Sequence, residues 1–441
     1  MRTILGIDVG SSKTVAIIAD IGDEPTITGV GIAKSKGIKK GTITNIELAS
    51  NSIKQAVTDA KRIAGTQVNK AIVSISSAYS QSLSSHGIVN VPTNEITISE
   101  INRAIQTAIY NANIPKDFVL LQAIPYAFKV DDITEIEDPE GMSGSRLEVF
   151  IHIVVVQQSA IDNIKKMLKL AGIGIENIVL SSFASAIATL NEDEKEQGVA
   201  LIDIGATTSD VAIFKDNAIR WTGFLPVGSH HITNDLAMAL HTTLLKAEEI
   251  KLNIDKYKDD DIIEVPLIGD ENHTKSSDIN SIKEIMNARI NETLFLLDNK
   301  LLKESGFKEV ITGIVLTGGF AKLHNLRERF ELFGNIAVRV AKPKEINGLF
   351  DNLKSPEFST AVGLIIYALG KHSSYEVDSN RVFRSKYKIE DTETHINEEF
   401  QPLAKPQSQI DEKEEIVDIV DKTHQNTSIF SKFKVWFDNL F

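Results

Sequence analysis

Short apolar runs separated by turn residues fill the first part of the chain and predict strands at Thr3–Val9, Thr14–Ile21 and Thr26–Ala33. The next segment carries apolar residues at the spacing of one helix face, and Gly65 follows where a C-terminal cap belongs. Those apolar positions are Ala49, Ile53, Ala56, Val57, Ala60 and Ala64. A further strand is predicted at Ala71–Ile75. Three strands, a helix and another strand predict an α/β fold.

The second half of the chain repeats this opening. Residues Ala200–Phe214 run as strand, Asp-x-Gly, small hydroxyl residues and strand, which is also the plan of Ile4–Ile18. A repeat at this coarse level predicts two lobes of related topology. Between the two halves, residues 84–158 combine a helix, a loop rich in Pro, Gly and acid, and a long strand, so we expect a small α/β insertion there. The compact body is expected to end near Lys371.

Composition narrows the classes of function. The chain has 441 residues, which suits two or more lobes better than one small core. Its formal net charge of -13 argues against a nucleic-acid partner, because non-specific binding to phosphate backbones needs a basic surface. The chain has no cysteine, which excludes disulfides, thiolate nucleophiles and metal sites built from Cys. No apolar stretch is long enough for a transmembrane helix.

The turn between the first two predicted strands has the residues of an anion site. Gly10 lets the backbone bend so that successive N–H groups face one ligand, which suits phosphate. Asp8 precedes it at the end of a strand, where a carboxylate can hold hydrated Mg²⁺. The other candidate ligands in this turn are Ser11, Ser12, Lys13 and Thr14. A plain hairpin with a polar turn is the alternative for this motif taken alone.

A second turn with the same plan strengthens the interpretation. It contains Asp203, Gly205, Thr207, Thr208 and Asp210. Two such turns facing each other would hold a triphosphate between the lobes. A third motif places Gly318 and Gly319 after a buried strand, where the missing side chains permit a flat ligand to approach the backbone. The chain has no Walker A motif, because "GIDVGSSK" lacks the required glycine spacing.

These three motifs, in this order and at these separations, resemble the actin/sugar-kinase/heat-shock-chaperone ATPase superfamily. The resemblance extends over most of residues 1–370 and is strongest to the FtsA family of actin-like bacterial cell division proteins. It is carried by "GIDVGSSKT", "GIKKGTITNIELA", "ITISEINRAI", "VDDITEIEDPEGMSGSRLEV", "LIDIGATTSDVAIF", "LPVGSHHITNDLA" and "VLTGGFAKL". The fold implied is a two-lobed, actin-like α/β ATPase fold with a small α/β subdomain inserted in the first lobe.

The resemblance implies ATP with Mg²⁺ in the cleft. Gly10, Ser11, Ser12, Lys13 and Thr14 would contact the phosphates from one lobe, and Gly205, Ala206 and Thr207 from the other. Glu248 and Lys251, in "AEEIK", would reach the ribose and adenine. Gly318, Gly319 and Phe320 would flank the base. Asp8 and Asp203 would organise Mg²⁺, largely through water, and Asp203 is the candidate catalytic residue.

The resemblance also suggests a division of the chain. The first lobe would comprise residues 1–83 and 159–197, with a return of the chain near 355–371. The inserted subdomain, 84–158, would serve self-assembly and recruitment. The second lobe core would comprise 198–234 and 306–354, and its outer subdomain, 235–305, would dock the C-terminal tail of FtsZ.

The end of the chain has its own pattern. Residues 385–427 are acidic and contain Pro and Gln, which predicts a disordered linker. The segment 428–441 places its apolar residues on one stripe of a helix, with Ser428 as N-cap. The stripe consists of Ile429, Phe430, Phe433, Trp436, Phe437, Leu440 and Phe441. Such a helix is too short to span a bilayer and is expected to lie in the headgroup boundary of the membrane. Docking on the protein's own core or in a partner's groove are the alternatives.

The function implied is that of an ATP-binding adaptor that tethers the FtsZ ring to the cytoplasmic face of the inner (plasma) membrane at the division site. It would self-assemble into an actin-like polymer and recruit later division proteins. The sequence departs from the superfamily where a Glu-Pro pair commonly begins the helix that links the lobes. Ser181 and Ser182 stand there instead, so we expect slow or negligible ATP hydrolysis. The alternatives are a PilM-like pilus-assembly adaptor and a sugar-kinase-like phosphotransferase.

Overall fold

A computed structural model describes residues 2–323 and 325–385. The predicted linker, apart from Ser385, and the predicted helix 428–441 lie outside these residues. Among the described helices, none combines the length and the apolar character needed to cross a membrane.

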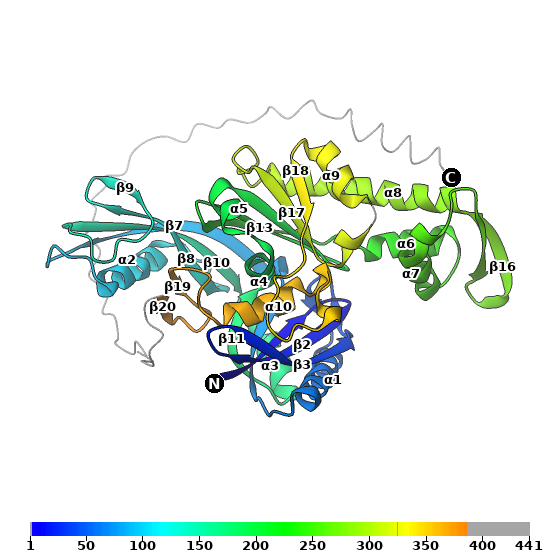
Figure 1. Ribbon diagram of the computed structural model, residues 1–441, viewed down its shortest axis with the longest axis horizontal. Coiled ribbons are helices and arrows are strands. Elements are labelled where there is room, and N and C mark those ends of the chain that lie inside the picture. Colours follow the sequence, from blue (N-terminus) through cyan, green and yellow to red (C-terminus); the bar gives the residue numbers. More distant parts are fainter. Residues whose placement is uncertain (1, 324, 386–441) are drawn as a thin grey trace, which may run out of the picture. The chain divides into compact units, whose positions relative to one another are not determined.

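The first sheet contains the strands predicted at the start of the chain (Figure 1). Its order is β11-β6-β1-β2-β3, in which β1 to β3 form an antiparallel meander and β6 and β11 are added in parallel. The strands are β1 (Arg2–Val9), β2 (Lys13–Ile21), β3 (Pro25–Lys34), β6 (Lys70–Ile75) and β11 (Gly174–Leu180). The predicted strands and the helix that follows them, α1 (Ile46–Ala64), are therefore confirmed.

Both faces of this sheet are covered by helices, and β2 shows how the sequence achieves this. Ala16 and Ile18 belong to the core under α1 and α3 (Gln158–Leu170). Val15 and Ile17 point to the opposite core, which contains α10 (Ser359–Tyr367). Since successive strand residues face opposite sides, a strand buried on both faces is apolar throughout.

The second lobe has a sheet with the same plan, in the order β14-β13-β12-β17-β18. Its strands are β12 (Val199–Ile204), β13 (Ser209–Lys215), β14 (Ala218–Leu225), β17 (Gly313–Thr317) and β18 (Ala337–Val340). Again an antiparallel meander continues into parallel strands, with β12 in the place of β1. The predicted repeat of topology between the two lobes is confirmed.

Three helices link the lobes, and two of them cross closely. The chain leaves the first sheet through α4 (Ser181–Thr189), reaches the second through α5 (Glu192–Gln197), and returns through α10. A Cβ added to Gly363 of α10 would lie 1.9 Å from the carbonyl oxygen of Ala184 on α4. Glycine at this position therefore lets the two backbones approach.

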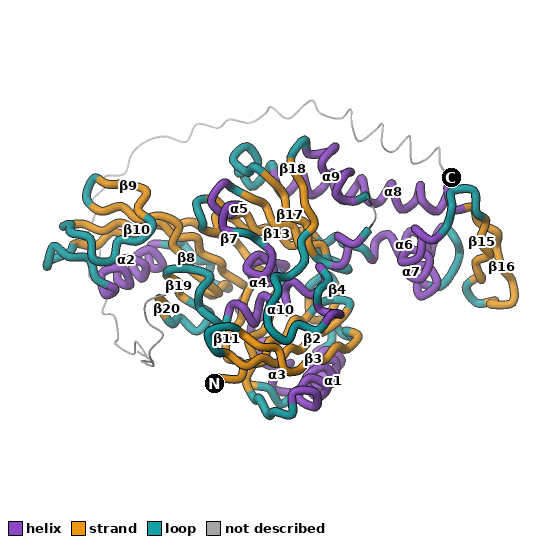
Figure 2. Tube along the Cα trace, in the orientation of Figure 1, coloured by secondary structure: helices purple, strands orange, loops and turns teal. Residues whose placement is uncertain are grey.

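The insertion forms a sheet of its own beside α2 (Ile98–Asn111) (Figure 2). The sheet follows the order β20-β19-β8-β10-β7, with β9 beside β8. From the insertion come β7 (Ser80–Asn90), β8 (Phe118–Val130), β9 (Ile133–Ile136) and β10 (Arg146–Gln157). The other two strands, β19 (Tyr375–Val377) and β20 (Phe383–Ser385), come from the end of the described chain. The expectation that the compact body ends near Lys371 was therefore wrong, because residues beyond it complete this sheet.

The outer part of the second lobe contains helices and one hairpin. Its elements are α6 (His230–Ala239), α7 (Leu244–Asn253), β15 (Ile262–Leu267), β16 (Asp270–Asp278) and α8 (Ile279–Leu296), and α9 (Leu326–Gly334) follows later in the chain. The small hairpin β4 (Ile38–Lys39) and β5 (Thr42–Ile43) lies in the first lobe, between β3 and α1. The sequence pattern does not indicate the β15–β16 hairpin. The reason is that β16, "DENHTKSSD", is polar at every position.

Candidate functional site: two glycine turns and three carboxylates

The first glycine turn joins β1 to β2. The amide of Gly10 donates a hydrogen bond of 3.1 Å to the carbonyl of Lys13, and a Cβ on Gly10 would lie 2.8 Å from that same oxygen. The turn is fixed from outside by the Ser35 amide, which donates to the Ser12 carbonyl at 3.0 Å. The sequence thus folds this segment into the tight turn that a phosphate site requires.

The second turn joins β12 to β13 with the same hydrogen bond, from the amide of Gly205 to the carbonyl of Thr208 at 2.8 Å. The start of α6 packs on it, since the amide of His230 donates to the carbonyl of Ala206 at 2.7 Å. The hydroxyl of Thr207 is buried and has no hydrogen-bond partner within the described part of the chain. A buried hydroxyl without a protein partner leaves a hydrogen bond for a ligand, water or ion at this turn to complete.

Three aspartates lie at the ends of the strands that carry these turns; Asp210 is buried, and Asp8 and Asp203 are partly buried. The hydroxyl of Ser74 on β6 donates to Asp8 at 2.8 Å. Asp210 belongs to the second lobe, yet it accepts a hydrogen bond of 2.8 Å from the backbone amide of Ser77 in the first lobe. Asp203 is held by the hydroxyls of Ser185 on α4, at 2.5 Å, and Thr360 on α10, at 3.1 Å. The three carboxylates are therefore fixed by hydroxyl and amide donors.

Burial changes the acidity of these aspartates. It raises the pKa of Asp8 to about 6, with the Ser74 hydrogen bond opposing and the charge of Asp203 adding to the rise. Burial likewise raises the pKa of Asp210 to about 6, and it raises the pKa of Asp203. A bound cation would relieve this crowding of negative charge.

The carboxylates at the site fit Mg²⁺ held largely through water, as the sequence predicts. Among the described residues, no three His, Cys, Asp or Glu side chains come together closely enough to hold a metal ion by themselves. Mg²⁺ usually keeps several waters and takes only one or two carboxylates from the protein. Asp8 and Asp203 are the residues that would hold it, together with water and phosphate oxygens.

The third glycine motif, at Gly318 and Gly319, packs against the carboxylate of Asp203. Gly318 has a φ of +86°, and a Cβ on it would lie 2.4 Å from Oδ1 of Asp203. Glycine is required there for both reasons. The ring of Phe320, by contrast, is fully buried in the core of the second lobe. A ring without exposed surface cannot stack on a base, so only the backbone of Phe320 is left to flank one.

Glu248 and Lys251 lie beside the second glycine turn, to which Ser229 connects Lys251. The ammonium of Lys251 donates to Glu248 at 2.7 Å, to the Thr233 hydroxyl at 2.9 Å and to the Ser229 carbonyl at 3.3 Å. Ser229 in turn donates its amide to the carbonyl of Gly205 at 3.1 Å. Lys251 is buried, and burial lowers its pKa while the Glu248 carboxylate opposes that shift. The assignment of these two side chains to ribose and adenine stays a prediction.

Lys13 of the first turn has partners that the sequence analysis did not find. Its ammonium lies 3.1 Å from a carboxylate oxygen of Glu357 and 3.6 Å from the centre of the Phe358 ring. The donors Ser74, Ser77, Ser185 and Thr360 were also missed, because their roles depend on tertiary neighbours. Asp210 could be recognised from the sequence, since it belongs to the repeated turn motif.

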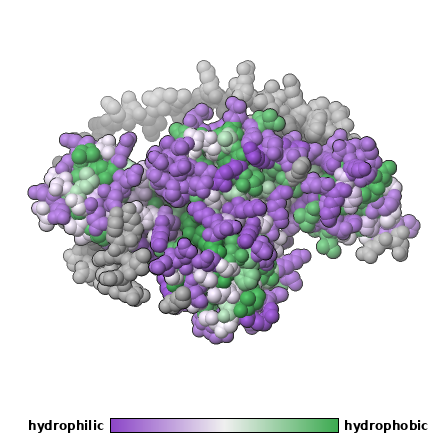
Figure 3. All heavy atoms as spheres, in the orientation of Figure 1, coloured by the Kyte–Doolittle hydropathy of each residue, from purple (hydrophilic) through white to green (hydrophobic). Residues whose placement is uncertain are grey.

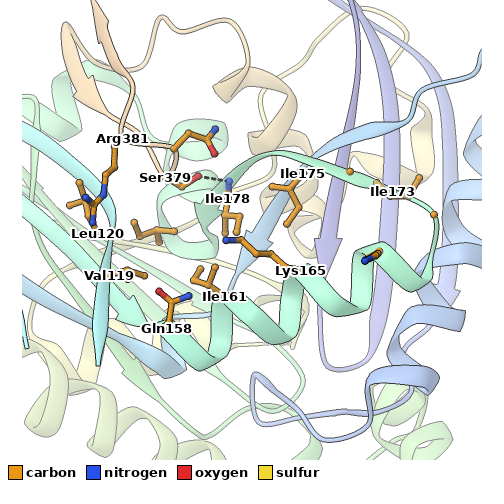
Figure 4. A pocket seen from close by; sticks show the side chains of 15 residues that line it. Val119, Leu120, Gln158, Ile161, Lys165, Ile173, Ile175, Ile178, Ser379 and Arg381 are labelled. Atoms are coloured by element: carbon orange, nitrogen blue, oxygen red, sulfur yellow. Dashed lines mark hydrogen bonds between the residues drawn. The ribbon is translucent and has the colours of Figure 1, made fainter. Parts of the chain in front are cut away.

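A large pocket in the described part of the chain lies elsewhere (Figure 4). It has a volume of about 740 Å³ and is formed by α3 and β11 of the first lobe, by β8 of the inserted subdomain and by the turn before β20. Apolar side chains such as Ile161 and Ile175 line it together with three basic ones, Lys165, Lys169 and Arg381. This pocket, defined here as the basic groove, contains none of the predicted nucleotide ligands.

The fold and the paired glycine turns define the class of protein: the chain has the actin-like fold. It aligns with solved structures of the PilM–PilN type IV pilus biogenesis complex, with a TM-score of 0.60 and 17% identity over 83% of this chain and 98% of that one. It also aligns with MreB5 of Spiroplasma citri bound to ADP, with a TM-score of 0.50 and 14% identity over 84% of this chain and 98% of that one.

Sequence comparisons then give the family. The model of "Cell division protein FtsA" matches residues 200–363, and that of "SHS2 domain inserted in FTSA" matches residues 77–155. The chain is 39% identical to the cell division protein FtsA of Helicobacter pylori, over 86% of this chain and 85% of the relative. It is 37% identical to that of Pseudomonas aeruginosa, over 84% and 90%. The chain belongs to the FtsA family of cell division proteins, which decides against the PilM-like alternative.

Proposed function

We propose that the chain is an ATP-binding adaptor that links FtsZ polymers to the cytoplasmic face of the inner membrane at the division site. The observation that carries this proposal is the pairing of two glycine turns, one from each lobe, around Asp8, Asp203 and Asp210 in a chain of the FtsA family. ATP suits the site because two anion-binding turns on opposite lobes can hold a polyphosphate. Nucleotide binding is supported by MreB5, a protein of the same fold whose crystal structure was solved with bound ADP.

The outer subdomain of the second lobe is the proposed docking surface for the C-terminal tail of FtsZ. On α6 and α7, large apolar side chains face solvent: Met238 is 76% exposed, Leu245 78% and Leu252 68%. Figure 3 shows apolar surface in this region, at the right of the view. Several long apolar side chains exposed on neighbouring helices are typical of a surface that binds a partner.

The membrane contact is proposed for residues 428–441, on the pattern of their sequence. Aromatic and aliphatic residues, among them Phe430, Trp436 and Phe437, would enter the headgroup boundary. One such tail gives a weak and reversible anchor, because ordering a short helix costs much of the gain from burial. Self-assembly of the bodies into an actin-like polymer would join many tails and raise the binding through effective concentration.

The basic groove is the proposed contact for a later division protein. It lies between the inserted subdomain and the first lobe, and its lining combines apolar side chains with Lys165, Lys169 and Arg381. Of the fifteen lining residues, none is acidic. The occupant that fits this chemistry is an extended segment of the partner with acidic and apolar side chains.

Liposome co-sedimentation tests the central proposal. The full chain is compared with a chain ending at Asn426, with and without ATP–Mg²⁺ and a peptide of the FtsZ tail. We expect the full chain to pellet with liposomes of anionic and neutral lipid, to do so more strongly with ATP, and to carry the peptide with it. Equal binding by the shortened chain would contradict the membrane role, and ATP turnover that depends on an added sugar would favour the phosphotransferase.

A further inference from the structure

One carboxylate connects the first phosphate turn to the third glycine motif. Glu357 belongs to the 3₁₀ turn Pro356–Phe358, which directly precedes α10. One of its oxygens lies 3.1 Å from the ammonium of Lys13, and the other lies 3.0 Å from the ammonium of Lys322. Lys13 ends the first turn, and Lys322 belongs to the turn Gly319–Lys322 of the second lobe. Glu357 therefore joins the two lobes at the proposed nucleotide site.

Lys13 is placed for phosphate as well as for Glu357. Its charge acts on Asp8 and Asp203, so the ammonium belongs to the same cluster as the two proposed magnesium ligands. The side chains of Lys13 and Glu357 are 25% and 27% exposed, so a ligand in solution can reach both. A phosphate group at the first turn would need this same ammonium.

Hydrogen bonds hold the backbone around Glu357, whereas its carboxylate is paired with the ammonium groups of Lys13 and Lys322. The carbonyl of Pro356 accepts hydrogen bonds from the Gly318 amide, at 3.2 Å, and from the Thr317 hydroxyl, at 3.1 Å. The hydroxyl of Ser359 lies 2.7 Å from that of Thr317. Pro356 and Ser359 thus fix the backbone on both sides of Glu357. A change of the Glu357 side chain therefore leaves these hydrogen bonds in place.

We infer that Glu357 is a specificity-determining residue of the phosphate site. Its carboxylate competes with the terminal phosphate of the nucleotide for the ammonium of Lys13. This inference rests on the proposed binding of ATP. Two effects act together: the carboxylate occupies the ammonium that the phosphate needs, and its own negative charge repels the phosphate. Both effects grow with the charge of the phosphate chain, so Glu357 lowers the affinity for a triphosphate more than for a diphosphate.

The test uses the full chain with Glu357→Gln, which keeps the shape of the side chain and removes its charge. Dissociation constants for ATP and ADP are measured by isothermal titration calorimetry at fixed Mg²⁺, pH and salt. We expect the variant to bind ATP roughly 3- to 5-fold more tightly than the unchanged protein does, the upper part of the range set by one partly exposed ion pair. ADP should gain about 2-fold or less, so that the ratio of the two affinities changes, which a purely structural role would not produce.

Asp351→Asn is the matched control. It removes the same charge from the same segment, but Asp351 is 98% exposed in its side chain and pairs with Lys354 instead. This variant should bind ATP as the unchanged protein does, and thermal unfolding checks that both variants are folded. If Glu357→Gln and Asp351→Asn gave the same affinities, the inference would be overturned while ATP binding stood. If the unchanged protein bound no ATP, the proposed function would fail and the inference with it.

Discussion

The backbone amide of Ser77 donates a hydrogen bond of 2.8 Å to the carboxylate of Asp210, and this bond joins the first lobe to the second. Asp210→Ala removes the acceptor and leaves a buried amide without its partner. We expect the free energy of unfolding to fall by about 1–3 kcal/mol. Asp210→Asn keeps an acceptor oxygen and should lose much less. Urea unfolding of both variants measures the difference, and equal losses would mean that this hydrogen bond does not hold the lobes together.

The crossing of α4 and α10 gives a second prediction. An Ala for Gly substitution inside a helix normally stabilises a protein by roughly 0.5–1 kcal/mol. At Gly363 the added Cβ would lie 1.9 Å from the carbonyl oxygen of Ala184, so the two helices must separate. We expect Gly363→Ala to reduce the free energy of unfolding by about 1–3 kcal/mol.

Gly313→Ala is the control for this substitution. Its Cβ would meet its nearest neighbour, the carbonyl oxygen of Ala337, at the ordinary distance of 3.5 Å. It should leave the unfolding midpoint in urea nearly unchanged. A Gly363→Ala variant as stable as this control would show that the helices can move apart at no cost.

A buried histidine predicts how stability depends on pH. His152 of β10 is 1% exposed, and its Nε2 lies 2.5 Å from the Ser82 hydroxyl on β7. Burial, with the charge of Arg220 adding to it, lowers its pKa from 6.5 to about 3. Below about pH 6.5 the unfolded chain binds a proton that the folded chain does not, so stability falls as the pH falls. The contribution of His152 is complete above pH 6.5 and is lost progressively towards pH 3.

At pH 5 the loss from this one residue should be about 2 kcal/mol, since each pKa unit corresponds to about 1.4 kcal/mol. Urea unfolding at pH 8, 6.5 and 5 measures it. The variant His152→Gln can still bind Ser82 and should show a flatter dependence on pH. His86 is exposed on β7 of the same sheet, and His86→Gln should keep the dependence of the unchanged protein. Parallel pH curves for all three proteins would refute the prediction.

Local patterns in the sequence were sufficient for the strands and for the glycine turns. Each turn is a contiguous segment in which Asp, Gly and hydroxyl residues have fixed spacings, and it recurs in the second lobe. The strands of the two repeated sheets are buried on both faces, so they stand out as apolar runs. Because the turn motif recurs, the sequence predicts two lobes of related fold rather than a single hairpin with a polar turn.

The features that were missed depend on contacts between distant parts of the chain. Nothing in the neighbourhood of Glu357 indicates that it pairs with Lys13, because the pairing arises only when α10 returns to the first sheet. The strands β19 and β20 are short and are stabilised by joining β8, through the pairing of Val377 with Ala123. Fully polar β16 gave no alternating pattern to detect. Such features follow from the tertiary fold and not from local propensity.

The last prediction concerns the rate of ATP hydrolysis. Ser181 donates its hydroxyl to the carbonyl of Ile75 at 3.0 Å, and the hydroxyl of Ser182 is buried without a partner among the described residues. Neither serine is a useful base at neutral pH, so we expect steady-state phosphate release slower than about 1 s⁻¹, the low end of ordinary enzymes. Ser181→Ala should leave the slow rate unchanged, whereas Asp203→Asn should lower it by about 10²-fold because it weakens the proposed magnesium site. A phosphate-release assay at saturating ATP–Mg²⁺ measures these rates. A faster rate in the unchanged protein, or a loss of the slow rate in Ser181→Ala, would contradict the prediction. Either result would mean that the helix linking the lobes supplies the catalytic group.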